Sequence, residues 1–187
     1  RRFPPRPTDL PVDEIAPLTG MVALPVSPNG VSLGWHGNAI LVRPEITMVD
    51  YRCSDLPGLE PRGAILADLA LRQGQLRIAG VHLGLFRHHR RKQLSALLSE
   101  LQSGSATPSA VAGDLNEWST RVGLGRLDAH YSIYAPGHSF HAKRPVAALD
   151  RIALDDRLTA ISGGVVETPL ARRASDPAWL VGPACHD

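Results

Sequence analysis

Asp114 and Asn116 form the pair of residues in this chain best placed for chemistry. They end an apolar segment, residues 109–112, in the tetrapeptide Gly-Asp-Leu-Asn. Residues two apart in an extended segment point the same way, so a carboxylate and a carboxamide project into one space. An aspartate can hold Mg²⁺ or orient a water molecule, and an asparagine can bind a phosphate oxygen. The alternative interpretation is that both residues only cap the turn that follows, as their types often do.

His82 is the second candidate, and it lies inside the apolar segment 80–84 (GVHLG). Such a histidine is often only a hydrogen-bonded core residue, but a basic run at residues 87–92 (RHHRRK) follows it and opens a helix. Cations at a helix N-terminus oppose the helix dipole unless an anion binds there. We therefore expect Arg87 and Arg91 to bind substrate, with a solvated run of charges as the alternative.

Asp150 is the third candidate, in the strand-like segment 148–152 (ALDRI). A carboxylate is rarely buried without a partner, and adjacent strand residues face opposite sides, so Arg151 cannot be that partner. We expect a cation, a histidine or a metal ion beside Asp150. Asp176 lies in an Arg-Ala-Ser-Asp segment near the chain end and is unremarkable by itself.

The candidate residues must be positioned by helices and strands, and the sequence pattern predicts mostly strands. Residues 1–19 are rich in proline and charge, which predicts an irregular lead-in. A helix is expected where leucines repeat at helical spacing, over residues 88–102. Two hairpins are expected, one of strands 64–71 and 76–83 and one of strands 147–154 and 158–166. The remaining expected strands cover residues 21–26, 38–42, 46–51 and 109–112.

Many strands in hairpins with few helices favour an α+β fold over a doubly wound parallel sheet. The specific prediction is a layered α/β sandwich of two mainly antiparallel sheets flanked by helices. The 187 residues suit one domain over 1–187, with no internal repeat or boundary.

Composition and net charge exclude few classes of function. A net charge of +2 is too balanced to indicate nucleic-acid binding, and three residues each of Phe, Trp and Tyr offer no base-stacking platform. Cys53 and Cys185 form no metal-type pair, which favours reduced thiols and a cytoplasmic protein. No stretch is long and apolar enough for a transmembrane segment. The opening (RRFPPRP) has no initiator methionine, so we expect that the chain was cut and that a targeting segment could have been lost.

Taken in chain order, four segments resemble the endonuclease/exonuclease/phosphatase superfamily, which includes deoxyribonuclease I-like nucleases, abasic-site endonucleases, sphingomyelinases and inositol-polyphosphate phosphatases. The resemblance runs from about residue 20 to residue 176. Each segment is weak alone, but four in the right order are specific. Residues 37–41 (GNAIL) look like the family's Gly-Asn-Ala strand, 80–84 like its Thr-His-Leu segment, 112–116 (AGDLN) like its Gly-Asp-Phe/Leu-Asn motif, and 149–152 (LDRI) like its Leu-Asp-Arg/Tyr-Ile strand.

The resemblance implies roles for the candidates. Asp114 would orient the attacking water, Asn116 would hold a phosphate oxygen, and His82 would stabilise the charge developing on the scissile phosphate. Asp150 would orient a histidine from a C-terminal Ser-Asp-His motif, and Asp176, in that motif, would bind the metal. Mg²⁺, or Mn²⁺ in its place, would neutralise the phosphate. Substrate-binding roles fall on Asn38, Arg87 and Arg91.

The sequence departs from the family pattern at two places. The opening strand, the following helix and the metal-binding Glu of a Leu-Gln-Glu segment have no counterpart, since Glu14 lies in a proline-rich stretch. Pro177 stands where the family has its general-base histidine, and the spacing does not support His186 as a replacement.

Three interpretations stay open. The first is a metal-dependent phosphoester hydrolase acting on nucleic acid, a phospholipid head group or an inositol phosphate. The second is a non-catalytic remnant that keeps an anion-binding cleft. The third is a nucleic-acid-binding module built on residues 87–92. The oligomeric state is not indicated by any feature of the sequence.

Overall fold

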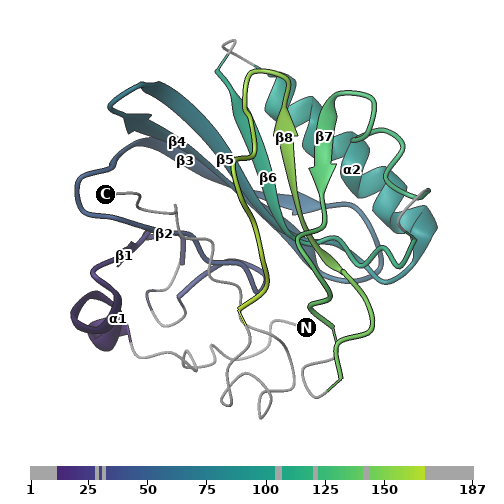
Figure 1. The fold of residues 1–187 in the computed structure, drawn as a ribbon, viewed down its shortest axis with the longest axis horizontal. Coiled ribbons are helices and arrows are strands. Elements are labelled where there is room, and N and C mark those ends of the chain that lie inside the picture. Colours follow the sequence, from purple (N-terminus) through teal and green to yellow (C-terminus); the bar gives the residue numbers. More distant parts are fainter. Residues whose placement is uncertain are drawn as a thin grey trace.

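The computed structural model describes residues 12–27, 30, 33–103, 107–119, 122–140 and 144–166. These residues form two helices, a small two-stranded sheet and a six-stranded sheet (Figure 1). In chain order the elements are α1 (Val12–Thr19), β1 (Val22–Ala23), β2 (Leu41–Val42), β3 (Thr47–Leu56), β4 (Arg62–Leu71), β5 (Gly74–His82), α2 (Arg87–Gln102), β6 (Ser109–Asp114), β7 (Tyr131–Tyr134) and β8 (Asp150–Asp155).

The large sheet has the strand order β3-β4-β5-β6-β8-β7 (Figure 1). Every neighbouring pair is antiparallel except β5 and β6, which run parallel. A parallel pair needs a crossover connection, and α2 supplies it between β5 and β6. The expected β4–β5 hairpin is confirmed, with Gly74 at a φ of 138° in its turn.

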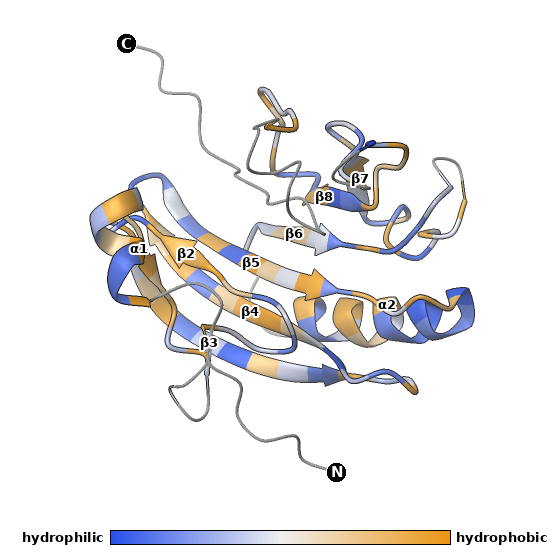
Figure 2. Cartoon of the chain, turned by 90° about the horizontal axis from the view of Figure 1, so that it is seen from below, coloured by the Kyte–Doolittle hydropathy of each residue, from blue (hydrophilic) through white to orange (hydrophobic). Residues whose placement is uncertain are grey.

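Helix α2 packs its leucine face on one side of this sheet, as the leucine spacing predicts. The helix begins one residue earlier than expected, at Arg87. Hydrophilic residues dominate its first turns and apolar residues its later ones (Figure 2). Its buried leucines join one core cluster with Val81 and Val111 of the neighbouring strands. The members contributed by the helix are Leu94, Leu97, Leu98 and Leu101.

The other side of the sheet carries a second core cluster beneath β1 and β2. Leu24 and Val26 are buried there against Ile65 and Leu69 of β4. Since Leu66 of the same strand belongs to the α2 cluster, β4 is buried on both faces. The predicted α+β sandwich of mainly antiparallel sheets is therefore confirmed.

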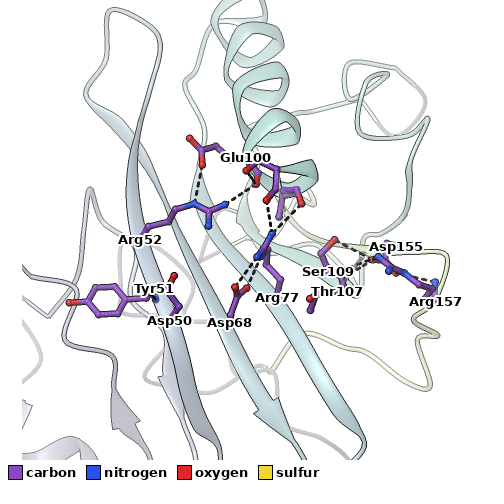
Figure 3. Close-up of polar contacts among 12 residues, drawn as sticks. Asp50, Tyr51, Arg52, Asp68, Arg77, Glu100, Thr107, Ser109, Asp155 and Arg157 are labelled. Atoms are coloured by element: carbon purple, nitrogen blue, oxygen red, sulfur yellow. Dashed lines mark hydrogen bonds and ion pairs between the residues drawn. The ribbon is translucent and has the colours of Figure 1, made fainter. Parts of the chain in front are cut away.

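Two arginines tie the C-terminal end of α2 to the sheet (Figure 3). Arg77 of β5 donates a pair of hydrogen bonds to the Asp68 carboxylate, at 2.6 and 2.8 Å, and further bonds to the carbonyls of Leu101 and Ser103. Arg52 of β3 pairs with Glu100 at 3.0 Å. A guanidinium near a helix C-terminus satisfies carbonyls that lack an intrahelical partner, so these contacts fix where α2 ends on the sheet.

The expectation of an irregular lead-in is wrong for residues 12–19, which form α1. Asp13 and Glu14 occupy the first turn, where carboxylates favour the helix dipole. Ile15 is buried, and Gly20 ends the helix at a φ of 66° while donating to the carbonyl of Ala16. These local signals outweigh the proline inside the helix. Residues 1–11 lie outside the described ranges.

The second expected hairpin is also wrong. Strand β8 forms as expected, but residues 158–166 have no regular structure. The reason is that both edges of β8 are already occupied, one by β6 and the other by β7. A strand that followed β8 could therefore not pair with it to form a hairpin.

Strands β1 and β2 are shorter than the predicted 21–26 and 38–42. Pro25 lacks the N–H that a longer β1 would need. Residues Trp35 to Asn38 form a tight turn before β2, in which each end residue donates its N–H to the carbonyl of the other. His36 and Gly37 both have positive φ values, 46° and 83°, as a two-residue hairpin turn requires.

Candidate active site

His82, Asp114 and Asp150 stand side by side on three adjacent strands. His82 is the register partner of Asp114 in the parallel β5–β6 pair, and Asp114 is the register partner of Asp150 in the antiparallel β6–β8 pair. Register partners project to the same face of a sheet. The three side chains therefore form a row at one end of the sheet, on the face opposite α2. The predicted catalytic residues 82, 114 and 150 are thus brought together.

The histidine and the first aspartate of this row lie within ion-pair distance. His82 Nε2 is 3.6 Å from Asp114 Oδ2, and about a third of each side chain is exposed, 34% and 30%. The other carboxylate oxygen, Oδ1, accepts the backbone N–H of Asn116 at 2.8 Å. Asp114 is thereby held in one orientation, with one oxygen anchored in its own turn and the other directed toward the imidazole.

Asn116 sits in a turn that only a few residue types adopt easily. Its φ is 50°, in the left-handed region that asparagine tolerates better than most residues. Its side-chain N–H donates to the carbonyl of Leu83 at 2.7 Å, and this carbonyl fixes which end of the carboxamide is nitrogen. A carboxamide nitrogen carries two N–H groups, so one remains for a ligand, together with the oxygen.

A cleft of about 840 Å³ opens in front of the row. The polar side chains His82, Asp114, Asn116 and Asp150 line one part, and the apolar side chains of the exposed sheet face line another. Trp118, which is 61% exposed, lies at its rim with its ring 5.6 Å from that of Phe140. The cleft has the size of a small-molecule site and combines apolar walls with few polar groups.

Asn38 lines the same cleft, but its donors serve the fold. Its side-chain nitrogen contacts the carbonyls of Trp35, His36 and Gly63 at 3.1 to 3.4 Å. This clamp holds the 35–38 turn against β4. A Cβ at Gly37 in this turn would lie 3.7 Å from His82 Nδ1, so the turn packs over the imidazole. Asn38 thus shapes the wall beside His82, and its predicted substrate contact stays a prediction.

Comparison with known proteins places this geometry in a family. The family model described as "Endonuclease/Exonuclease/phosphatase family" matches residues 5–176. The chain belongs to this family.

The relatives share sequence over part of the chain. The "Uncharacterized protein YbhP" of Escherichia coli (strain K12) is 33% identical over 132 residues, which is 64% of this chain and 51% of that protein. The chain therefore spans about half the length of the curated relatives it matches.

Solved structures share the fold at low identity. The mannosyl-6-phosphatase of Bacteroides thetaiotaomicron superimposes with a TM-score of 0.67 at 15% identity, covering 84% of this chain and 71% of that one. The TDP2 protein of D. rerio, complexed with a single-strand DNA product, superimposes with a TM-score of 0.61 at 16% identity, covering 81% and 69%. The fold is therefore that of the endonuclease/exonuclease/phosphatase family.

Sequence reasoning missed a buried ion pair directly behind the family motif. Arg90 of α2 and Glu117 are 4% and 6% exposed, and Arg90 Nη2 donates to Glu117 Oε2 at 2.8 Å. Arg90 also donates to the carbonyls of Gly84 and Leu85. The pair therefore joins three segments: the start of α2, the loop after β5, and the loop after β6.

Glu117 is held in its charged form by these contacts. Burial alone would raise the pKa of Glu117, but the N–H of Ser119 and the Arg90 guanidinium outweigh it, and the pKa lies below its ordinary value. Arg151, 5% exposed, donates to the carbonyls of Glu117 and Ser119 from the face of β8 opposite Asp150. Asp150 and Arg151 face opposite sides of the strand, as predicted.

A helical-spacing argument would have found Arg90. It precedes Leu94 by four residues and Leu97 by seven, so it lies on the buried face of α2. His89 is also buried, which means that residues 87–92 do not form one solvent-facing basic stripe.

Arg87 and Arg91 lie outside the cleft. They line a different cavity, together with Gly123 and Arg126, and the two cavities share no lining residue. Side chains alternate between the two faces of β6, and Asp114 points away from the face on which α2 packs. The arginines of α2 and the cleft therefore lie on opposite sides of the sheet. A direct contact of these arginines with a phosphate beside His82 is therefore not supported by the fold.

Other predicted positions cannot be placed at the cleft. Asp176, Pro177, His186 and Cys185 lie outside the described residues. Glu14 is exposed on α1 and is not among the residues lining the cleft. Within the described ranges, no group of three or more His, Cys, Asp or Glu side chains gathers as a metal site. No helix in these ranges has the length and apolar character needed to cross a membrane.

Proposed function

We propose that the cleft binds and hydrolyses a phosphoester, with a water molecule oriented by Asp114 and with help from a divalent cation, Mg²⁺ or Mn²⁺. The observation that carries this proposal is the row of His82, Asp114 and Asp150 on adjacent strands, with Asn116 beside it. Membership of the endonuclease/exonuclease/phosphatase family supports the same chemistry.

The contacts of each residue suggest its task. Asp114 Oδ2 is the carboxylate oxygen left to accept a hydrogen bond from water, because Oδ1 is anchored by the Asn116 N–H. The second side-chain N–H of Asn116 can donate to a phosphate oxygen. His82, at the edge of the row, can donate to another phosphate oxygen and stabilise the charge that develops on it. Asp114 or His82 can take the proton that the attacking water loses.

The carboxylates of the row suit a hard divalent cation such as Mg²⁺ or Mn²⁺. Mg²⁺ is commonly bound through one or two carboxylates, with water and substrate phosphate completing its shell. Asp114 and Asp150 offer two carboxylates from facing positions, whereas no larger cluster of protein ligands is found among the described residues. The resemblance adds Asp176 as a further ligand. When bound, the cation would neutralise the phosphate and polarise it toward attack.

The substrate beyond the phosphoester group is not assigned by the cleft. The names of the two structural relatives indicate a mannose phosphate for one and single-strand DNA for the other. The aromatic rim of Trp118 and Phe140 would suit a sugar face as well as a base. We therefore propose the reaction class, and hydrolysis of a panel of sugar phosphates and nucleotides identifies the alcohol component.

The test is hydrolysis of bis-p-nitrophenyl phosphate with Mg²⁺ or Mn²⁺ by the wild type, by Asp114→Ala and by Asp156→Ala. Asp156 is a matched control because its side chain is 95% exposed and does not line the cleft. We expect metal-dependent hydrolysis that disappears with Asp114→Ala and with EDTA and survives Asp156→Ala. Hydrolysis by Asp114→Ala at the wild-type rate would refute the proposal. Phosphate binding without any turnover would instead support a non-catalytic remnant.

A further inference from the structure

A second cavity, behind the sheet, gathers three arginines from two segments. It has a volume of about 360 Å³, and its basic lining is Arg87 and Arg91 of α2 and Arg126 of the turn after Leu124. Its remaining lining includes Gly123 and a single carboxylate, Asp128. Three guanidinium groups against one carboxylate leave a net charge of +2 around the cavity.

The side chains of these three exposed arginines make no hydrogen bond or ion pair with any residue in the described ranges, although Arg87 lies near enough to Glu117 to help lower the pKa of that carboxyl. The arginines that support the fold all donate to carboxylates or carbonyls, namely Arg52, Arg62, Arg77, Arg90, Arg151 and Arg157. Cations that repel one another gain stability when an anion sits between them.

The start of α2 adds an independent observation at the same place. Arg87 is the first residue of this 16-residue helix, and its N-cap, Phe86, makes no side-chain capping hydrogen bond. The first turn contains no acidic residue. The positive end of the helix dipole therefore adds to the arginine charges. The nearby Glu60 carboxylate accepts the N–H of Leu85, before the helix, and is paired with Arg62.

The nearest buried carboxylate is already paired with an arginine that does not line the cavity. Glu117 lies directly under Gly123, since a Cβ built on this glycine would be 2.0 Å from Glu117 Oε2. Its charge is already matched by Arg90 at 2.8 Å, on the buried side. Glu117 also attracts Arg87, but it makes no ion pair with an arginine of the cavity, so most of the cavity's charge is left to an external ligand.

We propose that Arg87, Arg91 and Arg126 form a second anion site, which binds a dianionic phosphate group separately from the cleft. The charge of +2 matches a phosphate dianion, and planar guanidinium groups bind phosphate oxygens through paired hydrogen bonds. The ligand is inorganic phosphate or the phosphate end of a small phosphomonoester. Since the two cavities share no lining residue, the site does not depend on hydrolysis in the cleft.

The test is a titration with inorganic phosphate, and separately with glycerol 3-phosphate, followed by the NMR signals of the arginine Nε–H groups. The single variants Arg87→Gln, Arg91→Gln and Arg126→Gln assign these signals, so binding here is distinguished from binding in the cleft. We expect saturable shifts of these three signals with either probe. Equal affinities would identify the phosphate alone as the ligand, and tighter binding of glycerol 3-phosphate would show that the rest of the cavity also takes part.

A matched triple variant separates a built site from general charge attraction. Replacing all three arginines by Gln should weaken phosphate binding by at least about tenfold. Replacing the exposed Arg43, Arg72 and Lys92 by Gln removes the same charge outside the cavity and should change the affinity by less than about twofold. Equal losses in the two triple variants, or no shift of the three signals, would overturn the proposal. Thermal unfolding of each variant confirms that it is folded.

Discussion

Asp114 and Asp150 are register partners on β6 and β8, so two acidic side chains face each other across one ladder. Like charges directly opposite each other on a sheet destabilise it, and a cation bound between them relieves the repulsion. Under our proposal this facing pair belongs to the cation site.

Metal binding should therefore stabilise the protein through this pair. At a Mg²⁺ concentration of about 100 times the dissociation constant, linkage predicts about 2.7 kcal/mol of added stability. Asp150→Asn should lose most of this gain, and the matched change Asp156→Asn should keep it. The measurement is the midpoint of thermal unfolding with and without Mg²⁺. An undiminished gain in Asp150→Asn would place the cation elsewhere.

The buried pair of Arg90 and Glu117 should be far more sensitive than an exposed pair of the same kind. Glu117→Gln leaves the buried Arg90 guanidinium without its counterion, at a cost of about 3 kcal/mol. Glu100→Gln breaks the half-exposed pair with Arg52 and should cost less than about 1 kcal/mol. Urea unfolding of both variants measures the difference. Similar losses in the two would mean that Glu117 does not hold the loops together as described.

Acid should weaken the junction between β5 and the end of α2. The hydrogen bonds from Arg77 hold the pKa of Asp68 below its ordinary value, although partial burial opposes them. A carboxyl with a lowered folded pKa contributes stability above its unfolded pKa, about 3.9, and loses it as the pH falls through the folded value. Asp68→Asn should therefore be less stable at neutral pH, and its stability should decline less steeply below about pH 5. Unfolding free energies between neutral pH and pH 2 test this, and parallel curves for the variant and the wild type would refute it.

Gly113 should not accept a side chain. Its φ is 144°, and a Cβ there would lie 1.9 Å from the backbone oxygen of Val81, which cannot move without breaking the β5–β6 ladder. Gly113→Ala should cost more than about 2 kcal/mol. Gly125→Ala is the matched control, since nothing lies within 4 Å of a Cβ there. Chemical denaturation of both variants measures the difference, and equal free energies of unfolding would contradict the close contact between Gly113 and the Val81 carbonyl.

The sequence predicts the site better than its surroundings. The spacing of two residues predicts that Asp114 and Asn116 point the same way. The order of the family-like motifs along the chain adds His82 and Asp150 to the same site, because of the resemblance to the family. Register then depends on which strands become neighbours. The parallel pairing of β5 with β6 and the insertion of β8 beside β6 are long-range choices that no local pattern contains.

The differences between expectation and structure have the same physical origin. Residues 158–166 have strand-like composition, but both edges of β8 are already paired, so the expected hairpin cannot form, and only the tertiary structure determines that. The start of α2 looks like one basic run, yet helical geometry turns Arg90 into the core and leaves Arg87 and Arg91 on another surface. The composition of residues 87–92 gives the charge of the segment, and the packing of the helix decides which of these charges are buried and which are exposed.

We propose that Asp114, in its row with His82 and Asp150, activates water toward a phosphoester. The most direct test is kcat/KM for bis-p-nitrophenyl phosphate with saturating Mg²⁺ in Asp114→Asn, a change that keeps the shape and removes the charge. We expect a loss of at least about 100-fold, as for other groups that act on the reacting atoms, beside a change of less than about twofold in Asp156→Asn. Wild-type kcat/KM in Asp114→Asn would show that the Asp114 carboxylate does not activate the water.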